Sequence, residues 1–305
     1  MALVQPDGVL LLDKPPGYSS TQALARSKRM LAARKAGHTG TLDPFATGLL
    51  PLVFGEATKF SRFLIDSTKS YRATLDLGVT STTGDPEGSL SPRQPPCSDV
   101  PAIDDVLAGF VGVRDQIPPM HSAVHHEGRR LYDLAREGLQ VERTPRRIEI
   151  LHLRRASLDG SALQVDVTCS KGTYVRTLAI EIGEALGCGA YLIALRRTAV
   201  GRFRLEQAFS LEALEAAGVE GARASLLPVE VLVAGLARWD APADTALRFT
   251  QGQVVEGAGA RPGEERAVFD PAGRFLGVGR AGDHGTLAPE RLMATGGPAK
   301  LPDFA

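Results

Sequence analysis

The chain has 305 residues, of which 43% are hydrophobic and 23% charged, as is typical of soluble globular proteins. Its 35 basic and 35 acidic residues cancel, which argues against a globally basic nucleic-acid-binding protein. The apolar runs are too short to cross a bilayer, and the first residues, MALVQPDG, predict no secretory signal. Three cysteines without CxxC spacing argue against a disulfide framework and favour a reduced, cytoplasmic setting.

The first part of the chain predicts strands and helices in an irregular order. GVLLLDKPPG predicts a strand that ends in a Pro-Gly turn. SSTQALARSKRMLAA predicts a helix that starts with a capping box at Ser19, and we expect its exit at Gly37. Residues 56–67 place apolar side chains on one helical face, and the stretch that begins at Tyr71 alternates as a half-buried strand.

The later elements follow the same mixed pattern. We expect helices at 102–112, 171–187 and 210–218 and strands at 146–158, 162–170 and 189–203. In the second of these strands, alternate residues from Leu163 to Cys169 face inward. From about Trp239 the chain changes to Gly-punctuated segments that predict short strands at 245–259, 266–283 and 285–294.

This order of elements predicts the fold class. Because strands and helices do not alternate regularly, we expect an α+β fold with a mixed or antiparallel central sheet and flanking helices, not a doubly wound fold. A small β domain follows it. We place the two domains at residues 1–235 and 236–305, with residues 118–138 as a polar excursion from the core of the first.

Charge is segregated along the chain although it cancels in total. Residues 76–115 carry seven acids and two bases, residues 143–155 carry five arginines and one acid, and residues 171–204 carry six bases and two acids. A segregated basic surface can bind phosphates in a neutral protein. Solvated strand faces explain the same pattern equally well.

The stretch KAGHTGTLDPFATGLLPLVFG, residues 35–55, contains one carboxylate, Asp43, among glycines and threonines. An Asp-Pro pair is usually a simple turn. Here Gly37, Gly40 and Gly48 let the backbone turn sharply and approach a ligand, and His38 is close enough to share a pocket. The alternatives are therefore an ordinary turn and a pocket built around one acid.

Five motifs resemble, in order, those of the bacterial TruB family of tRNA pseudouridine synthases, which modify uridine 55 in the TΨC arm. The resemblance runs from about residue 8 to residue 204, and a weaker one to an RNA-binding PUA-like domain covers residues 236–305. The motifs are GVLLLDKPPGYSS, GHTGTLDPFATGLLPLVFGEATK, YRATLDLGVTSTTGD, QIPPMHSAVHHEGRRLYDLAREG and CSKGTYVRTLAIEIGEALG.

The resemblance implies that the N1–C1′ bond of uridine breaks and that C5 of the uracil then bonds to C1′. Asp43 matches the family's essential aspartate. A glycosidase needs a second carboxyl to manage a poor leaving group and water, whereas uracil delocalises its charge and stays bound as the nucleophile. Attack on C1′, stabilisation of a cation there and removal of the C2′ proton all remain open. None of them requires a metal or an organic cofactor.

The resemblance also assigns roles to residues that would otherwise be read as core or surface. Arg176 matches the arginine that pairs with the catalytic aspartate, and Tyr71 matches the aromatic that stacks on the target base. Tyr174 and Leu195 match pocket-lining positions. His38 matches a residue that contacts the tRNA near the flipped base.

Two further features concern the pocket loop and the RNA. Lys14 and Pro15 match the first family motif, for which we expect structural support of the pocket loop. Residues 118–145 resemble the thumb that closes on the RNA stem-loop. The family usually has an aromatic residue where this chain has His121, and a lysine near His125. With no partnering Glu or Cys, a metal site at these histidines is not expected.

The sequence therefore predicts a stand-alone tRNA pseudouridine synthase, a cytoplasmic monomer that flips its target base and needs no protein partner. Two alternatives remain. One is a tRNA-binding or tRNA-folding factor whose chemistry is incidental, which the basic segments suggest. The other is a guide-dependent synthase, since that branch shares part of the Asp43 motif; the absence of obvious basic tails argues against it.

Overall fold

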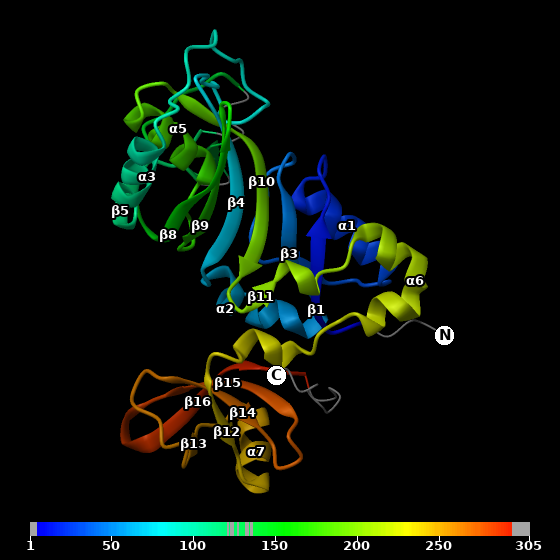
Figure 1. The fold of residues 1–305 in the computed structure, drawn as a ribbon. Helices are drawn as coiled ribbons and strands as arrows, with labels where there is room; N and C mark the ends of the chain where they lie inside the picture. The colour runs from blue at the N-terminus through cyan, green and yellow to red at the C-terminus, as the bar shows by residue number, and fades with distance from the viewer. Residues whose placement is uncertain are drawn as a thin grey trace.

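The computed structural model describes residues 5–120, 122, 125–126, 128–131, 134 and 137–294. A large sheet forms the N-terminal part, and a smaller β domain follows it (Figure 1). In the described part of the chain, no helix is both long and apolar enough to cross a membrane.

The large sheet has nine strands, and seven of them follow the order β1-β3-β10-β4-β9-β8-β5, with β2 paired to β3 and β11 to β10. β3 and β10 run parallel, and the other pairs are antiparallel, so the sheet is mixed as predicted. Its strands are β1 Gly8–Lys14, β2 Ala36–His38, β3 Thr47–Phe54, β4 Lys69–Leu77, β5 Gly112–Gln116, β8 Arg146–Asp159, β9 Ala162–Cys169, β10 Ala190–Val200 and β11 Phe203–Arg204.

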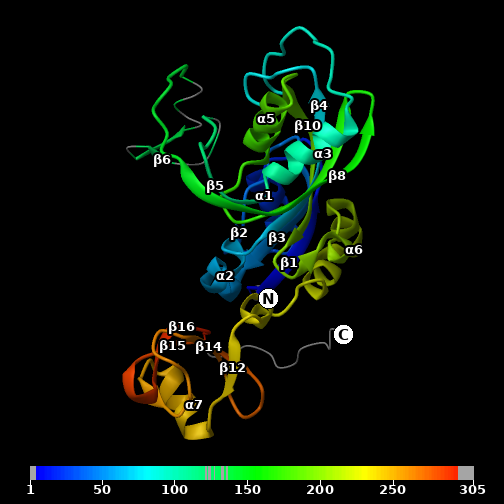
Figure 2. The ribbon, with the colours of Figure 1, turned by 60° about the vertical axis from the view of Figure 1, so that its left-hand side comes forward.

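Helices cover the sheet in two groups. α3 and α5 pack together against β8 and β10, and α1 and α6 pack together beside β1 (Figure 1). The β6–β7 ladder, His125–His126 with Arg129–Arg130, projects past β5 (Figure 2). The helices of this part are α1 Ser20–Met30, α2 Arg62–Ile65, α3 Val100–Gly109, α5 Val175–Ala185 and α6 Leu211–Ala224, with 3-10 turns η1 Gly55–Phe60, η2 Leu205–Gln207 and η3 Val229–Val233.

Some helix limits differ from the predicted ones. The capping box at Ser19 is present, but α1 ends at Met30, and Gly37 lies in β2 rather than at a helix exit. The predicted helix 56–67 is divided into η1 and α2. α6 continues beyond the predicted end at Gly218, which interrupts the helix with a φ of 65°.

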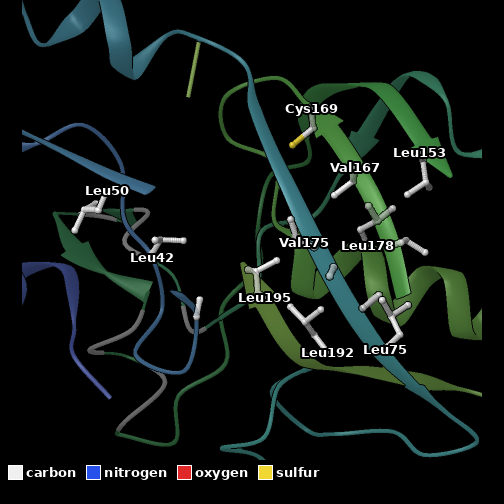
Figure 3. Close-up of a cluster of buried hydrophobic side chains, with 14 of the residues drawn as sticks. Leu42, Leu50, Leu75, Leu153, Val167, Cys169, Val175, Leu178, Leu192 and Leu195 are labelled. Atoms are coloured by element: carbon white, nitrogen blue, oxygen red, sulfur yellow. The ribbon is translucent and has the colours of Figure 1, made fainter. Parts of the chain in front are cut away.

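The main core lies between the sheet and α5. Side chains from β4, β9, β10 and α5 gather there (Figure 3). The predicted inward face of β9, from Leu163 to Cys169, is buried in this cluster. Burial of one face of each strand fixes the strand register, because a shift by one residue would expose that face.

The C-terminal β domain has five strands in the order β12-β14-β15-β16-β13. Residues 245–250, predicted as part of a strand, belong instead to α7, where Asp244 in the first turn favours a helix N-terminus. The elements are β12 Ala237–Asp240, α7 Ala243–Thr250, β13 Val255–Glu256, β14 Glu265–Phe269, β15 Phe275–Ala281, η4 Asp283–Gly285 and β16 Thr286–Leu292.

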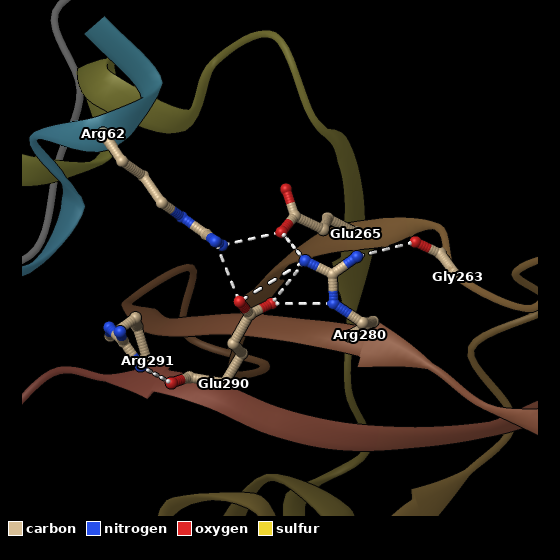
Figure 4. Close-up of polar contacts among 6 residues, drawn as sticks. All are labelled: Arg62, Gly263, Glu265, Arg280, Glu290 and Arg291. Atoms are coloured by element: carbon tan, nitrogen blue, oxygen red, sulfur yellow. Dashed lines mark hydrogen bonds and ion pairs between the residues drawn. The ribbon is translucent and has the colours of Figure 1, made fainter. Parts of the chain in front are cut away.

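A shared apolar cluster and an ion-pair cluster join the two sheets. The ring centroids of Phe60 and Phe275 lie 5.2 Å apart in an edge-on contact. Arg62 of α2 pairs with Glu265 at 2.6 Å and Glu290 at 2.8 Å, and Arg280 binds the same two carboxylates (Figure 4). The β domain is therefore held against the segment that links β3 to β4.

Candidate active site

Asp43 lies in the loop between β2 and β3, and several hydrogen bonds fix this loop. The hydroxyl of Ser20, at the start of α1, accepts from the Leu42 N–H at 2.8 Å and donates to the Leu42 carbonyl at 3.1 Å. The Gly17 N–H donates to the Pro44 carbonyl at 2.9 Å. The backbone on both sides of Asp43 is thus tied to the turn that follows β1, while its side chain stays 33% exposed.

Arg176, in the first turn of α5, joins Asp43 to a second carboxylate. Its Nε lies 3.0 Å from Oδ2 of Asp43, and its Nη1 lies 3.0 Å from Oδ2 of Asp85. The Asp85 carboxylate also accepts from the hydroxyl of Thr83 and from the N–H of Glu87. Because Arg176 and Asp85 are buried and Asp43 is partly open, only Asp43 is presented to a ligand.

Asp85 was not among the site residues predicted from the sequence. It is the last residue of the quoted motif YRATLDLGVTSTTGD, and it entered only as one acid in the charge of residues 76–115. The local sequence signal for Asp85 was the polar turn TSTTGD, residues 80–85. Its partner Arg176 is 91 residues away, a contact that no local pattern indicates.

The pKa of Asp43 is raised above its usual value, chiefly because burial disfavours the charged carboxylate. The positive charge of Arg176 opposes this rise, as does that of Lys14, and the negative charge of Asp85 adds to it. The site therefore holds a poorly solvated carboxylate whose ionised form is favoured mainly by one guanidinium. A poorly hydrated carboxylate in a fixed orientation can act as a nucleophile or a base.

Tyr71 in β4 lies opposite Arg197 in β10. Burial raises the pKa of the Tyr71 hydroxyl, while the charge and hydrogen bond of Arg197 oppose the rise. Arg197 is itself buried and donates to three carbonyls of the Asp43 loop and β3, those of Gly40, Thr41 and Leu49. It thereby ties the strand beside Tyr71 to the loop of Asp43, a role that was not predicted from the sequence.

Three sequence families match successive parts of the chain: “TruB family pseudouridylate synthase (N terminal domain)” at residues 28–175, “tRNA pseudouridylate synthase B C-terminal domain” at 176–234 and “Pseudouridine synthase II TruB, C-terminal” at 242–293. The tRNA pseudouridine synthase B of Thiobacillus denitrificans is 52% identical over 292 residues, 95% of this chain and 96% of that protein. The chain belongs to the TruB family of pseudouridine synthases. Pseudouridine synthases are isomerases, so the family assigns this chain to that class of enzymes.

Other relatives agree with the family and the fold. The Burkholderia mallei protein of the same name is 51% identical over 95% of this chain and 98% of its own length. A chain of a crystal structure of a Cbf5-Nop10-Gar1 complex has a TM-score of 0.73 at 26% identity, covering 94% of this chain and 85% of that one. A structure of an H/ACA RNP bound to a substrate RNA containing 2′-deoxyuridine gives 0.70 at 26% identity, covering 93% and 84%. The predicted α+β class and family are confirmed.

Lys14, the last residue of β1, lies beneath the Asp43 loop. Its Nζ donates to the carbonyls of Pro15, Tyr18 and Pro44, at 3.0, 2.6 and 3.3 Å. Burial lowers the pKa of Lys14 to about 8, while the charge of Asp43 opposes the shift. In this TruB-family chain the lysine thus joins the turn after β1, through Pro15 and Tyr18, to the Asp43 loop, through Pro44.

His38 ends β2, on the approach to the Asp43 loop. Burial and the charge of Arg197 lower the pKa of His38, which favours the neutral imidazole. Among the described residues its buried Nδ1 has no hydrogen-bond partner. A neutral ring with one nitrogen unpaired by these residues can accept or donate one hydrogen bond to a ligand.

Tyr174 and Leu195 lie at different depths. Tyr174 is half-buried at the N-terminus of α5, two residues before Arg176. Leu195 lies in β10 opposite Ala73, is 8% exposed and belongs to the main core. The structure thus pairs Asp43 with Arg176 and places Lys14 where its charge acts on Asp43, whereas Leu195 belongs to the apolar core.

The predicted thumb is described only in part. His121 lies outside the described residues, and only the backbone strand β6 is described for His125. Within the described ranges, no group of three or more His, Cys, Asp or Glu is arranged to hold a metal ion.

Proposed function

We propose that this chain converts uridine to pseudouridine at position 55, in the TΨC loop of tRNA. We further propose that it acts as a cytoplasmic monomer without a guide RNA or protein partner. The observation that carries the proposal is the pair of Asp43 and Arg176, with Nε 3.0 Å from Oδ2. The neighbouring charge of Asp43 also influences the pKa of Tyr71, which lies within electrostatic reach.

The reaction suits a single carboxylate that is partly open to a ligand. The N1–C1′ bond breaks, the uracil keeps the bonding electrons, turns within the pocket and forms a C5–C1′ bond; C5 then loses its proton and N1 gains one. Asp43 acts at the ribose, either at C1′ or on the C2′ proton, and must be ionised for both. Because the uracil returns as the nucleophile, exclusion of water protects the intermediate. Asp85 is buried, pairs with Arg176 and accepts hydrogen bonds from Thr83 and Glu87, so it does not serve as a second acid.

The target base must leave the folded T-loop to reach Asp43. Flipping a base costs a few kcal/mol, and stacking on an aromatic ring returns roughly 1–3 kcal/mol. Stacking on Tyr71 alone therefore barely balances the cost. Phosphate contacts supply the remainder, and we assign them to the thumb, residues 118–145, to the arginines of residues 143–155 and to a PUA-like domain at residues 236–305.

The test is to incubate purified protein with an unmodified tRNA transcript, without any other protein or RNA, and to map pseudouridine. Product at uridine 55 supports the proposal, and its absence at that position overturns it. Asp43→Asn should abolish the product and retain tRNA binding, because the amide keeps the shape of the carboxylate but neither attacks nor removes a proton. A transcript with cytidine at position 55 is the matched control.

The alternative role in tRNA binding and folding is separable by the same variant. Cells that lack the protein should regain pseudouridine 55 only with the wild-type chain. If Asp43→Asn restores growth fully in those cells, the biological need is met by binding, while the proposed reaction still stands in vitro.

A further inference from the structure

Gln116, the last residue of β5, makes a two-point contact with the backbone of Tyr174. The Tyr174 N–H donates to Oε1 of Gln116 at 2.8 Å, and Nε2 of Gln116 donates to the Tyr174 carbonyl at 3.2 Å. Gln116 is 2% exposed. A buried amide is costly unless its polar atoms are hydrogen-bonded. Rotation of this side chain would break both hydrogen bonds away from water, so the amide is held in one orientation.

The contact falls on the first residues of α5. Tyr174 is the N-cap residue of this helix and its own side chain makes no capping hydrogen bond. The first N–H groups of a helix have no partner within the helix. Gln116 accepts from the N–H of the N-cap residue, the bond that the N3 side chain makes in a capping box, and it fixes the backbone at the point where α5 begins.

Arg176 is the second residue of α5, so its guanidinium depends on how the helix begins. Two partners from separate loops must be met at once: Asp43 by Nε and Asp85 by Nη1, each at 3.0 Å. A small rotation of the helix start is amplified along the arginine side chain. Such a rotation would lengthen the contact with Asp43 or the one with Asp85.

The same glutamine stands at the root of the predicted thumb. Ile117 and Pro118 follow it directly, and Nη1 of Arg143, near the other end of residues 118–145, donates to the Pro118 carbonyl at 3.1 Å. Thus Gln116 joins the base of this segment to the helix that carries both Tyr174 and Arg176.

We propose that Gln116 is a positioning residue of the isomerisation, which acts by holding the start of α5 so that Arg176 orients Asp43. This inference rests on the proposed function. It requires that loss of the Gln116 contact weaken the chemical step more than tRNA binding. It also requires a change in the ionisation of Asp43, whose charged and titratable neighbours are Arg176, Asp85, Lys14 and Tyr71.

The test compares Gln116→Met with the wild type by steady-state kinetics on unmodified tRNA. Methionine keeps the length and fills the space but makes neither hydrogen bond. We expect kcat to fall about tenfold to a hundredfold, as for a small misplacement of a catalytic group, with KM nearly unchanged. The acid limb of the pH profile should move to higher pH, because Arg176 then opposes the raised pKa of Asp43 less.

Two further variants separate positioning from stability. Gln116→Glu keeps the acceptor for the Tyr174 N–H and loses the donor, so its kcat should lie between those of the wild type and Gln116→Met. Ser210→Ala removes the N-cap bond to Ala213 at the start of α6 and should leave both kcat and the acid limb unchanged. If Gln116→Met does not fold, Gln116→Glu alone carries the test.

The outcomes are distinct. Wild-type protein without activity on tRNA overturns the proposed function, whatever the variants do. Active wild type with an unchanged kcat and acid limb in the Gln116 variants overturns the positioning role alone. A rise in KM with constant kcat also overturns it, since the glutamine would then serve binding.

Discussion

Nη1 of Arg176 lies 3.0 Å from Oδ2 of Asp85, and both side chains are shielded from water. The two residues come from α5 and from the loop after β4, so their pairing joins two segments that lie 91 residues apart in the chain. Because Nε of the same guanidinium holds Asp43, the Asp85 carboxylate fixes the orientation of Arg176 and, through it, that of Asp43.

Asp85→Asn should therefore lower both stability and activity. Removing Asp85 leaves the buried charge of Arg176 with Asp43 as its remaining carboxylate partner, at a cost of up to about 3 kcal/mol in the free energy of unfolding. We expect kcat to fall about tenfold or more, because Arg176 loses one of its two fixed points. Urea unfolding and single-turnover kinetics measure the two effects.

Asp166→Asn is the matched control for Asp85→Asn. Asp166 also binds arginines, Arg72 at 2.9 Å and Arg154 at 3.3 Å, but these pairs lie on the surface of the sheet. Loss of this carboxylate should lower the free energy of unfolding by less than about 1 kcal/mol and leave kcat unchanged. Equal kcat values for wild type and Asp85→Asn would contradict the supporting role.

Two buried lysines should make the free energy of unfolding depend on pH in the alkaline range. Burial lowers the pKa of Lys14 and that of Lys69 to about 8, from 10.5. Between about pH 8 and 10.5 the unfolded chain binds more protons than the folded one, so the free energy of unfolding should rise with pH. Each lysine contributes about 1–3 kcal/mol over this range.

The measurement is urea unfolding at several pH values across this range. Lys69→Met removes the contribution of a side chain whose Nζ donates to the carbonyl of Ile65, the last residue of α2, and to that of Ser67 just after it. The stability of the variant should rise less with pH than that of the wild type, and Lys14→Met should behave alike. Identical slopes in all three proteins would show that neither lysine titrates as expected.

The parts of the structure that the sequence predicted are those with a local or motif signal. The inward face of β9 follows from alternation, and the pairing of Asp43 with Arg176 follows from the family motifs. The roles of Arg197 and Gln116 were missed, because each depends on contacts 58 or more residues away, and neither residue type is distinctive by itself. Helix α7 was missed because a short helix among glycines resembles a strand in composition.

The ion-pair cluster at the domain junction should contribute a stability that depends on salt. Arg62→Gln leaves Glu265 and Glu290 with Arg280 as their guanidinium partner in the cluster (Figure 4). Since these side chains are partly exposed, we expect a loss of about 1 kcal/mol at low salt and less at high salt. Thermal unfolding at two salt concentrations measures this difference.

Arg238→Gln is the control for the junction. Arg238 pairs with Asp240 at 2.6 Å within the β domain, on an exposed strand, and does not bridge the two sheets. At low salt, Arg238→Gln should lower the unfolding temperature less than Arg62→Gln does. If both variants behave alike, the cluster adds nothing beyond an ordinary surface pair.

Gly48→Ala should break the contact between β3 and β10 that brings Arg197 to the Asp43 loop. Gly48 has a φ of 100°, and a Cβ there would lie 2.4 Å from the carbonyl oxygen of Arg197 and 2.7 Å from its nitrogen. Both atoms are backbone, so the strands must separate. We expect a loss of about 3 kcal/mol or more in the free energy of unfolding, together with loss of activity.

Gly37→Ala in the neighbouring strand β2 is the control for Gly48→Ala. Its Cβ would lie 3.7 Å from Cγ2 of Val53, an ordinary contact, and its φ lies outside the left-handed region. The free energy of unfolding of this variant should lie within about 0.5 kcal/mol of the wild-type value, since no neighbouring atom has to move. Urea unfolding of both proteins decides the matter: equal stability would mean that the close approach of Gly48 to Arg197 does not hold in solution.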